Sequence, residues 1–365
     1  MKILYDYQIL CAQKYGGISR YYYELVSRIS KYENTKIEIP ALFSCNYYFE
    51  NYFEKKSVSQ YSSRFGSLVR YANRKYTLLF GYKNYDIIHP TYYNPYIIGR
   101  LRGKLVVTVY DMIHELYPKE FSKEDKTAEF KREMIYKSDR IIAISESTKK
   151  DILRFYPDID QKKINVIYLG NSLSALDLKP DSCVVPDSKY VLFVGQRRAY
   201  KNFDNFIKAF AKAFANIDEM NVICTGGGPF STDELNLIND LDLGGRVTQK
   251  SLSDNDLAIA YCNAQCFVFP SFYEGFGIPV LEAFACKCPA LLSNRSSLPE
   301  VGGDAALYFN PESIDEIAEK LLRISSDEKL RSSLVKKGQE RLKLFDWDTI
   351  AEDTYNLYLD VSSEG

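Results

Sequence analysis

Residues 191–210, VLFVGQRRAYKNFDNFIKAF, contain the pattern that decides the fold of this chain. An apolar run of strand length ends at Gly195, a short basic loop follows, and an amphipathic helical pattern comes next. The same alternation of apolar runs and helical patterns continues in both directions along the 365 residues. Apolar strands that alternate with helices are typical of parallel sheets buried on both faces. The sequence therefore predicts an α/β fold.

The apolar runs form two series, which indicates two domains. Between them lie residues 171–189, which are rich in Ser, Asp and Pro and lack a sustained period, as a linker does. We place the first domain at residues 1–172, the linker at 173–188 and the second domain at 189–347. Two such domains should enclose a cleft, with ligands at the carboxyl ends of the strands. The predicted strands are Ile3–Tyr5, Ile37–Ile39, Ile87–His89, Leu105–Val109, Ile141–Ile144, Val166–Tyr168, Tyr190–Val194, Val222–Cys224, Val247–Gln249, Cys266–Phe269, Ala290–Leu292 and Ala306–Phe309.

The composition is that of a globular protein and excludes several classes. Hydrophobic residues make up 46% and charged residues 26%, and the net charge of -1 gives no general electrostatic reason to bind nucleic acid. The sequence shows no apolar run of membrane-spanning length and no signal peptide, so we expect a cytoplasmic protein. The eight cysteines form no Cys-x-x-Cys pair and there are two histidines, so a zinc site is not expected. Buried thiols are predicted at Cys262, Cys266, Cys286 and Cys288.

A second informative segment is residues 271–285, SFYEGFGIPVLEAFA, in which two carboxylates stand eight residues apart. Pro279 suits the first position of a helix, so Glu274 should lie in the preceding loop and Glu282 in the first turns. Backbone N–H groups near residues 276–280 then lack intrahelical partners and can receive a ligand. Carboxylates there can accept hydrogen bonds from hydroxyls, which suggests a sugar nucleotide. The alternative is an ordinary loop-to-helix junction with a solvated carboxylate.

Taken whole, this segment resembles the donor-binding motif of the family 4 glycosyltransferases, which are retaining enzymes with the GT-B fold. The resemblance extends over nearly the whole chain, through GGISRYYYEL, TVYDMIHE, VGQRRAYKNF and SSLPEVGGDAALYFNP. It implies two Rossmann-like domains with parallel sheets that face a central cleft. The first would bind the acceptor and the second the nucleotide-sugar donor. A C-terminal helix, about residues 348–365, would pack back on the first domain.

The resemblance also implies roles for residues of the second domain. Arg197 and Lys201 would stabilise the leaving diphosphate, with Arg198 either spare or a substitute. Glu274 would hold the sugar together with nearby N–H groups, and Glu282 would hold the ribose hydroxyls. The further donor-binding residues are Gly195, Gly226, Gly227, Leu252, Gly275, Phe276, Gly277 and Ile278 of this domain, together with Gly16 and Gly17 of the first domain.

On the acceptor side, Gly16 and Gly17 directly precede a predicted helix, where free N–H groups can approach a sugar or a phosphate. Arg20 would lie on its first turn, near phosphate or acceptor. Asp111 and His114 follow a predicted strand, and the resemblance implies that His114 contacts the donor sugar or orients the acceptor. His114 is not assigned as the general base, because in this family the leaving diphosphate is thought to take the acceptor proton.

A divalent metal is not expected. The three Asp-x-Asp pairs, at Asp158, Asp240 and Asp346, do not follow a buried strand into a suitable loop. Arg197 and Lys201 already supply positive charge, so no cofactor beyond the nucleotide sugar is predicted.

Residues 55–83 contain seven Lys or Arg, several aromatic residues and no acidic residue. A solvated basic helix is one interpretation. Contact with an anionic lipid surface, where a polyprenyl-diphosphate-linked acceptor would reside, is the other.

These observations lead to one function and two alternatives. We expect a metal-independent, retaining hexosyltransferase, with mannose from GDP-mannose as the first donor to test. The acceptor would be a glycan or a lipid-linked oligosaccharide in bacterial surface polysaccharide assembly, such as that of O-antigen, at or near the inner face of the membrane. The alternatives are a nucleotide-sugar 2-epimerase or hydrolase on the same fold and a non-catalytic partner subunit. The base, the sugar, the linkage, the acceptor and the oligomeric state stay open.

Overall fold

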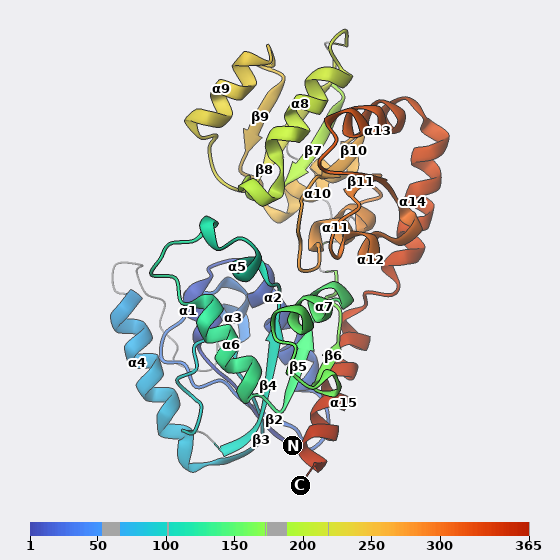
Figure 1. Ribbon diagram of the computed structural model, residues 1–365. Helices are drawn as coiled ribbons and strands as arrows, with labels where there is room; N and C mark the ends of the chain where they lie inside the picture. Colours follow the sequence, from blue (N-terminus) through green and yellow to red (C-terminus); the bar gives the residue numbers. More distant parts are fainter. Residues whose placement is uncertain (53–65, 101, 172, 174–187, 218, 365) are drawn as a thin grey trace. The chain divides into compact units, whose positions relative to one another are not determined.

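The computed structural model describes residues 1–52, 66–100, 102–171, 173, 188–217 and 219–364 (Figure 1). The chain forms two compact units. Unit 1 comprises residues 1–170 and 347–365, and unit 2 comprises residues 171–346. Most of the predicted linker, 173–188, lies outside the described residues.

Unit 1 contains a parallel six-stranded sheet in the order β2-β1-β3-β4-β5-β6. The sixth strand lies two residues earlier than predicted, because Ile164 pairs with Ile141 of β5. The other five predicted runs fall within or overlap their strands. The strands are β1 (Lys2–Tyr5), β2 (Lys36–Glu38), β3 (Asn84–His89), β4 (Arg102–Val109), β5 (Arg140–Ala143) and β6 (Ile164–Val166).

Two helices of unit 1 begin at residues that suit a helix start. The side chain of Ser145 accepts a hydrogen bond from the Thr148 N–H and caps α7. Gly16 is the N-terminal cap of α2. The helices are α1 (Gln8–Ala12), α2 (Gly17–Ile29), α3 (Tyr47–Tyr52), α4 (Gly66–Leu78), α5 (Ile113–Leu116), α6 (Thr127–Lys137), α7 (Glu146–Phe155) and α15 (Trp347–Ser363).

The C-terminal helix α15 is part of unit 1 and packs against α2 and β3 (Figure 1). Its buried side includes Trp347, Tyr358 and Val361. Leu359 lies outside this buried side and is 45% exposed. The helix thus buries a face that combines aromatic and aliphatic side chains.

Unit 2 contains a second parallel six-stranded sheet, in the order β12-β11-β10-β7-β8-β9. From β7 the chain moves outward through β8 and β9, and then returns to place β10 on the other side of β7. Such a reversal of strand order opens a ligand-binding crevice at the carboxyl ends of the two central strands. The strands are β7 (Tyr190–Val194), β8 (Asn221–Thr225), β9 (Val247–Lys250), β10 (Cys266–Phe269), β11 (Ala290–Ser293) and β12 (Ala306–Phe309).

The sequence of α8 explains how the unit 2 core is built. Phe203, Phe206 and Phe210 recur at helical spacing, are buried, and pack with Phe193 of β7 and with α13. The loop between β7 and α8 is thereby fixed at both ends. The helices are α8 (Phe203–Ala213), α9 (Thr232–Asp240), α10 (Asp254–Asn263), α11 (Ile278–Ala285), α12 (Leu298–Gly302), α13 (Ile314–Ser326) and α14 (Glu328–Leu342).

Three of the four cysteines predicted to be buried are buried, namely Cys266, Cys286 and Cys288. The prediction for Cys262 is wrong, since this residue is exposed. It lies near the end of α10, where Ala258, Ala260 and Tyr261 form the buried side. Within the described residues, all helices are too short or too polar to cross a membrane.

Candidate active site

The carboxyl ends of β7 and β8 carry glycines that let two loops approach each other closely. Gly195 follows β7 with a φ of 132°. Gly226, Gly227 and Gly228 follow β8 with φ values of 82°, 74° and 73°, a conformation that strongly favours glycine. A Cβ atom on Gly226 would lie 3.2 Å from the backbone of Gly195. We call residues 226–229 the glycine loop.

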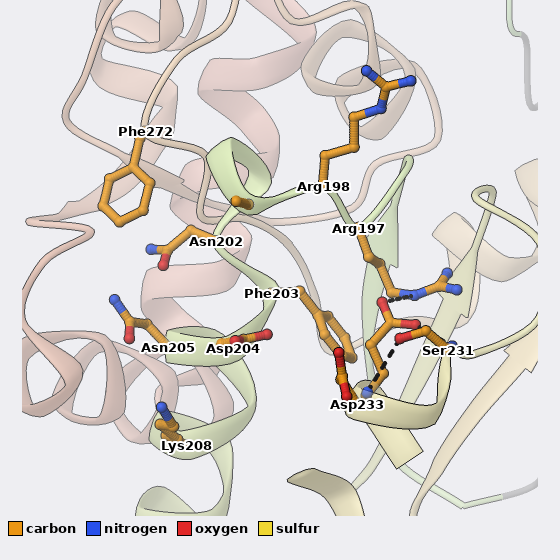
Figure 2. A pocket seen from close by; sticks show the side chains of 12 residues that line it. Arg197, Arg198, Asn202, Phe203, Asp204, Asn205, Lys208, Ser231, Asp233 and Phe272 are labelled. Atoms are coloured by element: carbon orange, nitrogen blue, oxygen red, sulfur yellow. Dashed lines mark hydrogen bonds and ion pairs between the residues drawn. The ribbon is translucent and has the colours of Figure 1, made fainter. Parts of the chain in front are cut away.

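Arg197 lies in the loop after β7 and points toward Ser231 and the first turn of α9 (Figure 2). Its guanidinium is hydrogen-bonded to Glu234 and to three carbonyls of the glycine loop. The side chain of Arg198 extends away from that of Arg197 (Figure 2). The two neighbouring arginines therefore have different surroundings.

Lys201 and Glu274 meet across the two central strands of the sheet. Lys201 comes from the loop after β7, and Glu274 comes from the loop after the adjacent strand β10. The Lys201 Nζ lies 2.7 Å and 2.8 Å from the two carboxylate oxygens of Glu274. The two side chains are 15% and 9% exposed. The pair thus lies at the reversal of strand order, where a ligand crevice is expected.

Three serines fix the loop that carries Glu274. Ser271 donates to a Glu274 carboxylate oxygen at 2.6 Å. The Ser296 hydroxyl accepts from the Glu274 N–H, and the Ser297 hydroxyl contacts the carbonyls of Glu274 and Phe276. The carboxylate is consequently held in one orientation by both its side chain and its backbone.

The helix after this loop begins one residue earlier than predicted. Ile278 is the first residue of α11 and Pro279 the second, because Gly277 adopts a φ of 107° and forms the cap. Glu282 lies on α11, as predicted, and accepts a hydrogen bond from the Tyr261 hydroxyl at 3.1 Å. Proline is tolerated in the first turn because its missing N–H would have no helical partner.

Two cavities adjoin the loop after β7. One of about 430 Å³ is lined by residues that include Arg197, Arg198, Lys208 and Phe272 (Figure 2). The other, of about 570 Å³, is lined by the glycine loop and by residues 196–198. Leu252 lies in the loop between β9 and α10 and is half-buried.

Unit 1 holds the remaining predicted residues. Gly16 caps α2, and a Cβ atom there would lie 2.3 Å from the side-chain oxygen of Gln13, so the Gln13 side chain would have to move aside. Gly17 is the first residue of α2. Arg20 lies one turn further on, with its guanidinium 5.0 Å from the centre of the Tyr48 ring.

His114 lies on the short helix α5, which follows β4. Its ring stacks on Phe121 with 3.8 Å between centroids, and its Nε2 is 3.6 Å from Asp125. The other ring nitrogen, Nδ1, is buried and has no hydrogen-bond partner. Burial, followed by the positive charge of Lys131, lowers the pKa of His114 below its ordinary value.

Two family profiles match the chain in succession. Glycosyltransferase Family 4 matches residues 15–174, and Glycosyl transferases group 1 matches residues 177–341. The chain belongs to the family 4 glycosyltransferases. The family predicted from the sequence motifs is therefore confirmed, and the protein is a glycosyltransferase.

Known proteins similar to this glycosyltransferase include polysaccharide enzymes. O-antigen chain mannosyltransferase B of Escherichia coli is 28% identical, over 94% of this chain and 95% of that protein. O-antigen chain mannosyltransferase RfbU of Salmonella typhimurium is 30% identical over 56% of each chain.

Solved structures confirm the predicted GT-B fold. Sucrose-phosphate synthase from Thermosynechococcus elongatus superposes with a TM-score of 0.73 at 20% identity, over 100% of both chains. Anabaena HepE in complex with UDP and glucose gives a TM-score of 0.74 at 17% identity, over 99% of this chain and 100% of that one.

Sequence reasoning about this glycosyltransferase missed Lys131. This α6 residue is fully buried, and its Nζ binds Glu115 and the Asp111 carbonyl at 2.7 Å and 2.8 Å. It ties both ends of the loop that carries His114 to α6. The sequence around Lys131, AEFKREM, resembles that of any solvated helix, so it does not indicate that this lysine is buried.

Sequence reasoning also missed Glu234, the carboxylate partner of Arg197. The Ser-x-x-Glu spacing of Ser231 and Glu234 forms a capping box at the start of α9, and this pattern was available in the sequence. The sequence could not show that the Glu234 carboxylate pairs with Arg197 across the glycine loop.

The three Asp-x-Asp pairs lie away from strand ends that could hold a metal. Asp158 accepts from Tyr136, Asp242 follows the end of α9, and Asp348 pairs with Arg28. Within the described ranges, groups of three or more His, Cys, Asp or Glu suited to hold a metal ion are absent.

Proposed function

We propose that this glycosyltransferase moves a hexose from a nucleotide sugar to a glycan or lipid-linked acceptor with retention of configuration. The observation that carries the proposal is the Lys201–Glu274 pair at the reversal of strand order in unit 2. The pair places a cation and a hydroxyl-accepting carboxylate side by side. A hydroxylated ring joined to a phosphate presents the complementary groups.

Donor binding would exchange the partners of this pair. A sugar hydroxyl would donate to Glu274, whose orientation Ser271 already fixes. The Lys201 ammonium would turn to a phosphate oxygen as a point charge. The bond between the anomeric carbon and the diphosphate breaks, and negative charge grows on the diphosphate next to this cation.

The acceptor step completes the transfer. The acceptor oxygen forms a bond to the anomeric carbon on the face that the diphosphate leaves, and the departing diphosphate takes the acceptor proton. Glu282 would hold the ribose hydroxyls, and His114 would orient the acceptor. The scheme uses neither a metal nor a cofactor beyond the nucleotide sugar.

Mannose from GDP-mannose is the proposed donor. The similar proteins of Escherichia coli and Salmonella typhimurium are named mannosyltransferases, which supports the sugar. The solved HepE complexes contain UDP or UDP-glucose, so uridine donors form the natural comparison.

The test is turnover with GDP-mannose, UDP-glucose, UDP-galactose and UDP-N-acetylglucosamine, each with a mannoside acceptor carrying a lipid diphosphate. We expect transfer from GDP-mannose, an α-linked product by NMR, and unchanged rates after chelation of divalent metals. Formation of a new nucleotide sugar without acceptor would indicate an epimerase instead. Nucleotide binding without any turnover would indicate a non-catalytic subunit.

We also propose that α4 contacts an anionic lipid surface. The buried side of α4 includes Val69, Asn73 and Thr77, which leaves the opposite side to solvent. Leu68 and Tyr71 on that exposed side are 64% and 58% exposed, and Leu79, which directly follows the helix, is 66% exposed. Exposed Arg70, Arg74 and Lys75 add positive charge. The other basic residues of segment 55–83 are not part of this proposed surface. Lys83 pairs with Glu38, and Lys55, Lys56 and Arg64 lie outside the described residues.

Replacing Arg70, Arg74 and Lys75 together by serine tests this surface. Each basic residue near an anionic membrane contributes about 1 kcal/mol, so the variant should bind phosphatidylglycerol-containing vesicles at least tenfold more weakly. Vesicle sedimentation measures the change, with pure phosphatidylcholine vesicles as reference. Lys212→Ser, an exposed change on α8, should bind as the unaltered protein does. Equal binding by the triple variant would contradict the lipid contact.

A further inference from the structure

The guanidinium of Arg197 is enclosed by hydrogen-bond acceptors of its own chain. Its Nε donates to a carboxylate oxygen of Glu234 at 2.7 Å. Its Nη1 donates to the Gly226 carbonyl, and its Nη2 donates to the carbonyls of Gly228 and Pro229, each at 2.9 Å. A guanidinium has five N–H groups. Four of them are therefore in use, and the side chain is only 3% exposed.

Two aromatic rings complete the enclosure. The guanidinium carbon lies 4.8 Å from the centre of the Phe230 ring and 5.9 Å from that of Phe203. Phe230 directly follows the glycine loop, and Phe203 begins α8. Arg197 thus connects the loop after β7, the glycine loop and the first turn of α9.

The position of Glu234 is fixed independently of Arg197. Its second carboxylate oxygen accepts from the Ser231 N–H at 2.6 Å, and its own N–H donates to the Ser231 hydroxyl. This capping box keeps the carboxylate at the start of α9. A diphosphate bound by Arg197 would therefore lie next to a fixed negative charge and be repelled.

Binding of a phosphate in a guanidinium fork needs two parallel N–H groups. Arg197 has one that makes no bond, so a second would have to leave a carbonyl or Glu234 without its donor. An unsatisfied buried acceptor costs about 1–3 kcal/mol. Lys201 differs, because its one carboxylate partner, Glu274, is itself a proposed sugar ligand.

The glycine loop needs an external constraint. Three consecutive glycines have wide backbone freedom, and their positive φ values are not imposed by side chains of their own. The bonds from Arg197 to three carbonyls supply that constraint. Residues 227–229 of the loop form one wall of the open cavity of about 570 Å³.

We propose that Arg197 is a positioning residue, which holds the glycine loop in the conformation that receives the nucleoside of the donor and does not itself carry the diphosphate. Lys201 then supplies the charge on the diphosphate, and Glu234 acts together with Arg197. This inference rests on the proposed function, that unit 2 binds a nucleotide sugar.

The test compares affinities along two series: guanosine, GMP and GDP, and uridine, UMP and UDP. Calorimetry or competition gives the dissociation constants for the unaltered protein and for Arg197→Met, Arg197→Lys, Glu234→Leu and Lys201→Met. Lys212→Met removes a cation from an exposed surface pair and is the matched control. Melting temperatures show which variants fold. If Arg197→Met does not fold, Glu234→Leu, which keeps the arginine, gives the same comparison.

We expect three variants, Arg197→Met, Arg197→Lys and Glu234→Leu, to bind every member of the bound series about tenfold more weakly. The ratio of diphosphate affinity to nucleoside affinity should therefore stay unchanged. Lys201→Met should lower that ratio about tenfold. Two results together would overturn the inference: Arg197→Met binds GDP or UDP more weakly but the nucleoside as well as before, and Glu234→Leu binds GDP or UDP more tightly. The proposed function would still stand. Failure of the unaltered protein to bind either series would overturn both.

Discussion

At the scale of single residues, the ion pair of Lys201 and Glu274 contributes both to folding stability and to catalysis. Lys201→Met leaves the carboxylate of Glu274, which is 9% exposed, with Ser271 but without its cation. We expect a loss of about 1–2 kcal/mol in the free energy of unfolding, less than for a fully buried pair. The turnover number should fall about 100-fold or more, because the leaving diphosphate loses its cation.

The double variant Lys201→Met with Glu274→Gln separates these two effects. Removing both charges should restore most of the stability, while activity stays as low as in the single variants. Urea unfolding and steady-state kinetics on the same preparations measure both quantities. Recovery of activity in the double variant would mean that Lys201 acts only by balancing Glu274.

Lys131 of α6 contributes to the lowered pKa of His114. Its ammonium group lowers the pKa of His114, while Asp111, Glu115 and Asp125 raise it, and burial is the largest contribution to the lowering. Removing the cation in Lys131→Met should therefore raise the pKa of His114. If neutral His114 orients the acceptor, the acid limb of the kcat/KM profile should move to higher pH.

The measurement is direct because the chain has two histidines. His89 is buried and its pKa is lowered to about 3, so a histidine that titrates in the folded protein between pH 4.5 and 8 is His114. NMR titration of unaltered protein, Lys131→Met and the exposed α6 variant Lys137→Met gives the comparison. An unchanged His114 pKa in Lys131→Met would reject this role for Lys131.

At the scale of elements, the junction of the Glu274 loop with α11 depends on one glycine. Gly277 has a φ of 107°, and a Cβ atom there would lie 3.0 Å from the Leu298 side chain. Gly277→Ala should destabilise unit 2 by about 1–3 kcal/mol and displace the loop that holds Glu274. Activity should fall more steeply than stability alone explains.

Gly244→Ala is the matched control, because Gly244 has no positive φ and open space around its Cβ position. Its melting temperature and rate should equal those of the unaltered protein or rise slightly. Thermal unfolding and steady-state kinetics decide the matter: equal behaviour of the two alanine variants would show that the junction tolerates a side chain.

The same elements show what sequence can and cannot predict here. Strands buried on both faces are continuous apolar runs, so 191–194 and 266–269 are correctly predicted as strands. Helix α11 begins at Ile278 because a backbone angle at Gly277 sets its start, and residue types alone do not fix that angle. The partners of Arg197 and Lys131 come from segments 16–37 residues away in sequence, and their pairing depends on tertiary geometry.

At the scale of the whole molecule, α15 joins the beginning and the end of the chain within unit 1. The Tyr358 hydroxyl bonds to Tyr5 of β1 at 3.0 Å and to His89 of β3. His89 also bonds to Thr108 of β4 at 2.8 Å through its other nitrogen. A neutral imidazole can serve both contacts, so the C-terminal helix is attached to the sheet through a buried group that has to stay uncharged.

This attachment predicts an acid-sensitive unit 1. Burial lowers the pKa of His89 from 6.5 to about 3, so the unfolded chain binds an extra proton between these values. The stability that neutral His89 contributes is complete above pH 6.5 and is lost progressively as the pH falls toward 3. Between pH 7.5 and pH 5.0 the loss from this residue should be about 2 kcal/mol.

The single tryptophan, Trp347, lies at the start of α15 and is buried, so its fluorescence in urea reports the unfolding of this part of unit 1. His89→Asn should be less stable at pH 7.5, because the network loses its bonds, but about 2 kcal/mol less sensitive to acid. Tyr358→Phe also weakens the network yet keeps the histidine, so its acid sensitivity should match that of the unaltered protein. If His89→Asn loses as much stability between pH 7.5 and 5.0 as Tyr358→Phe does, the acid sensitivity of unit 1 comes from groups other than His89.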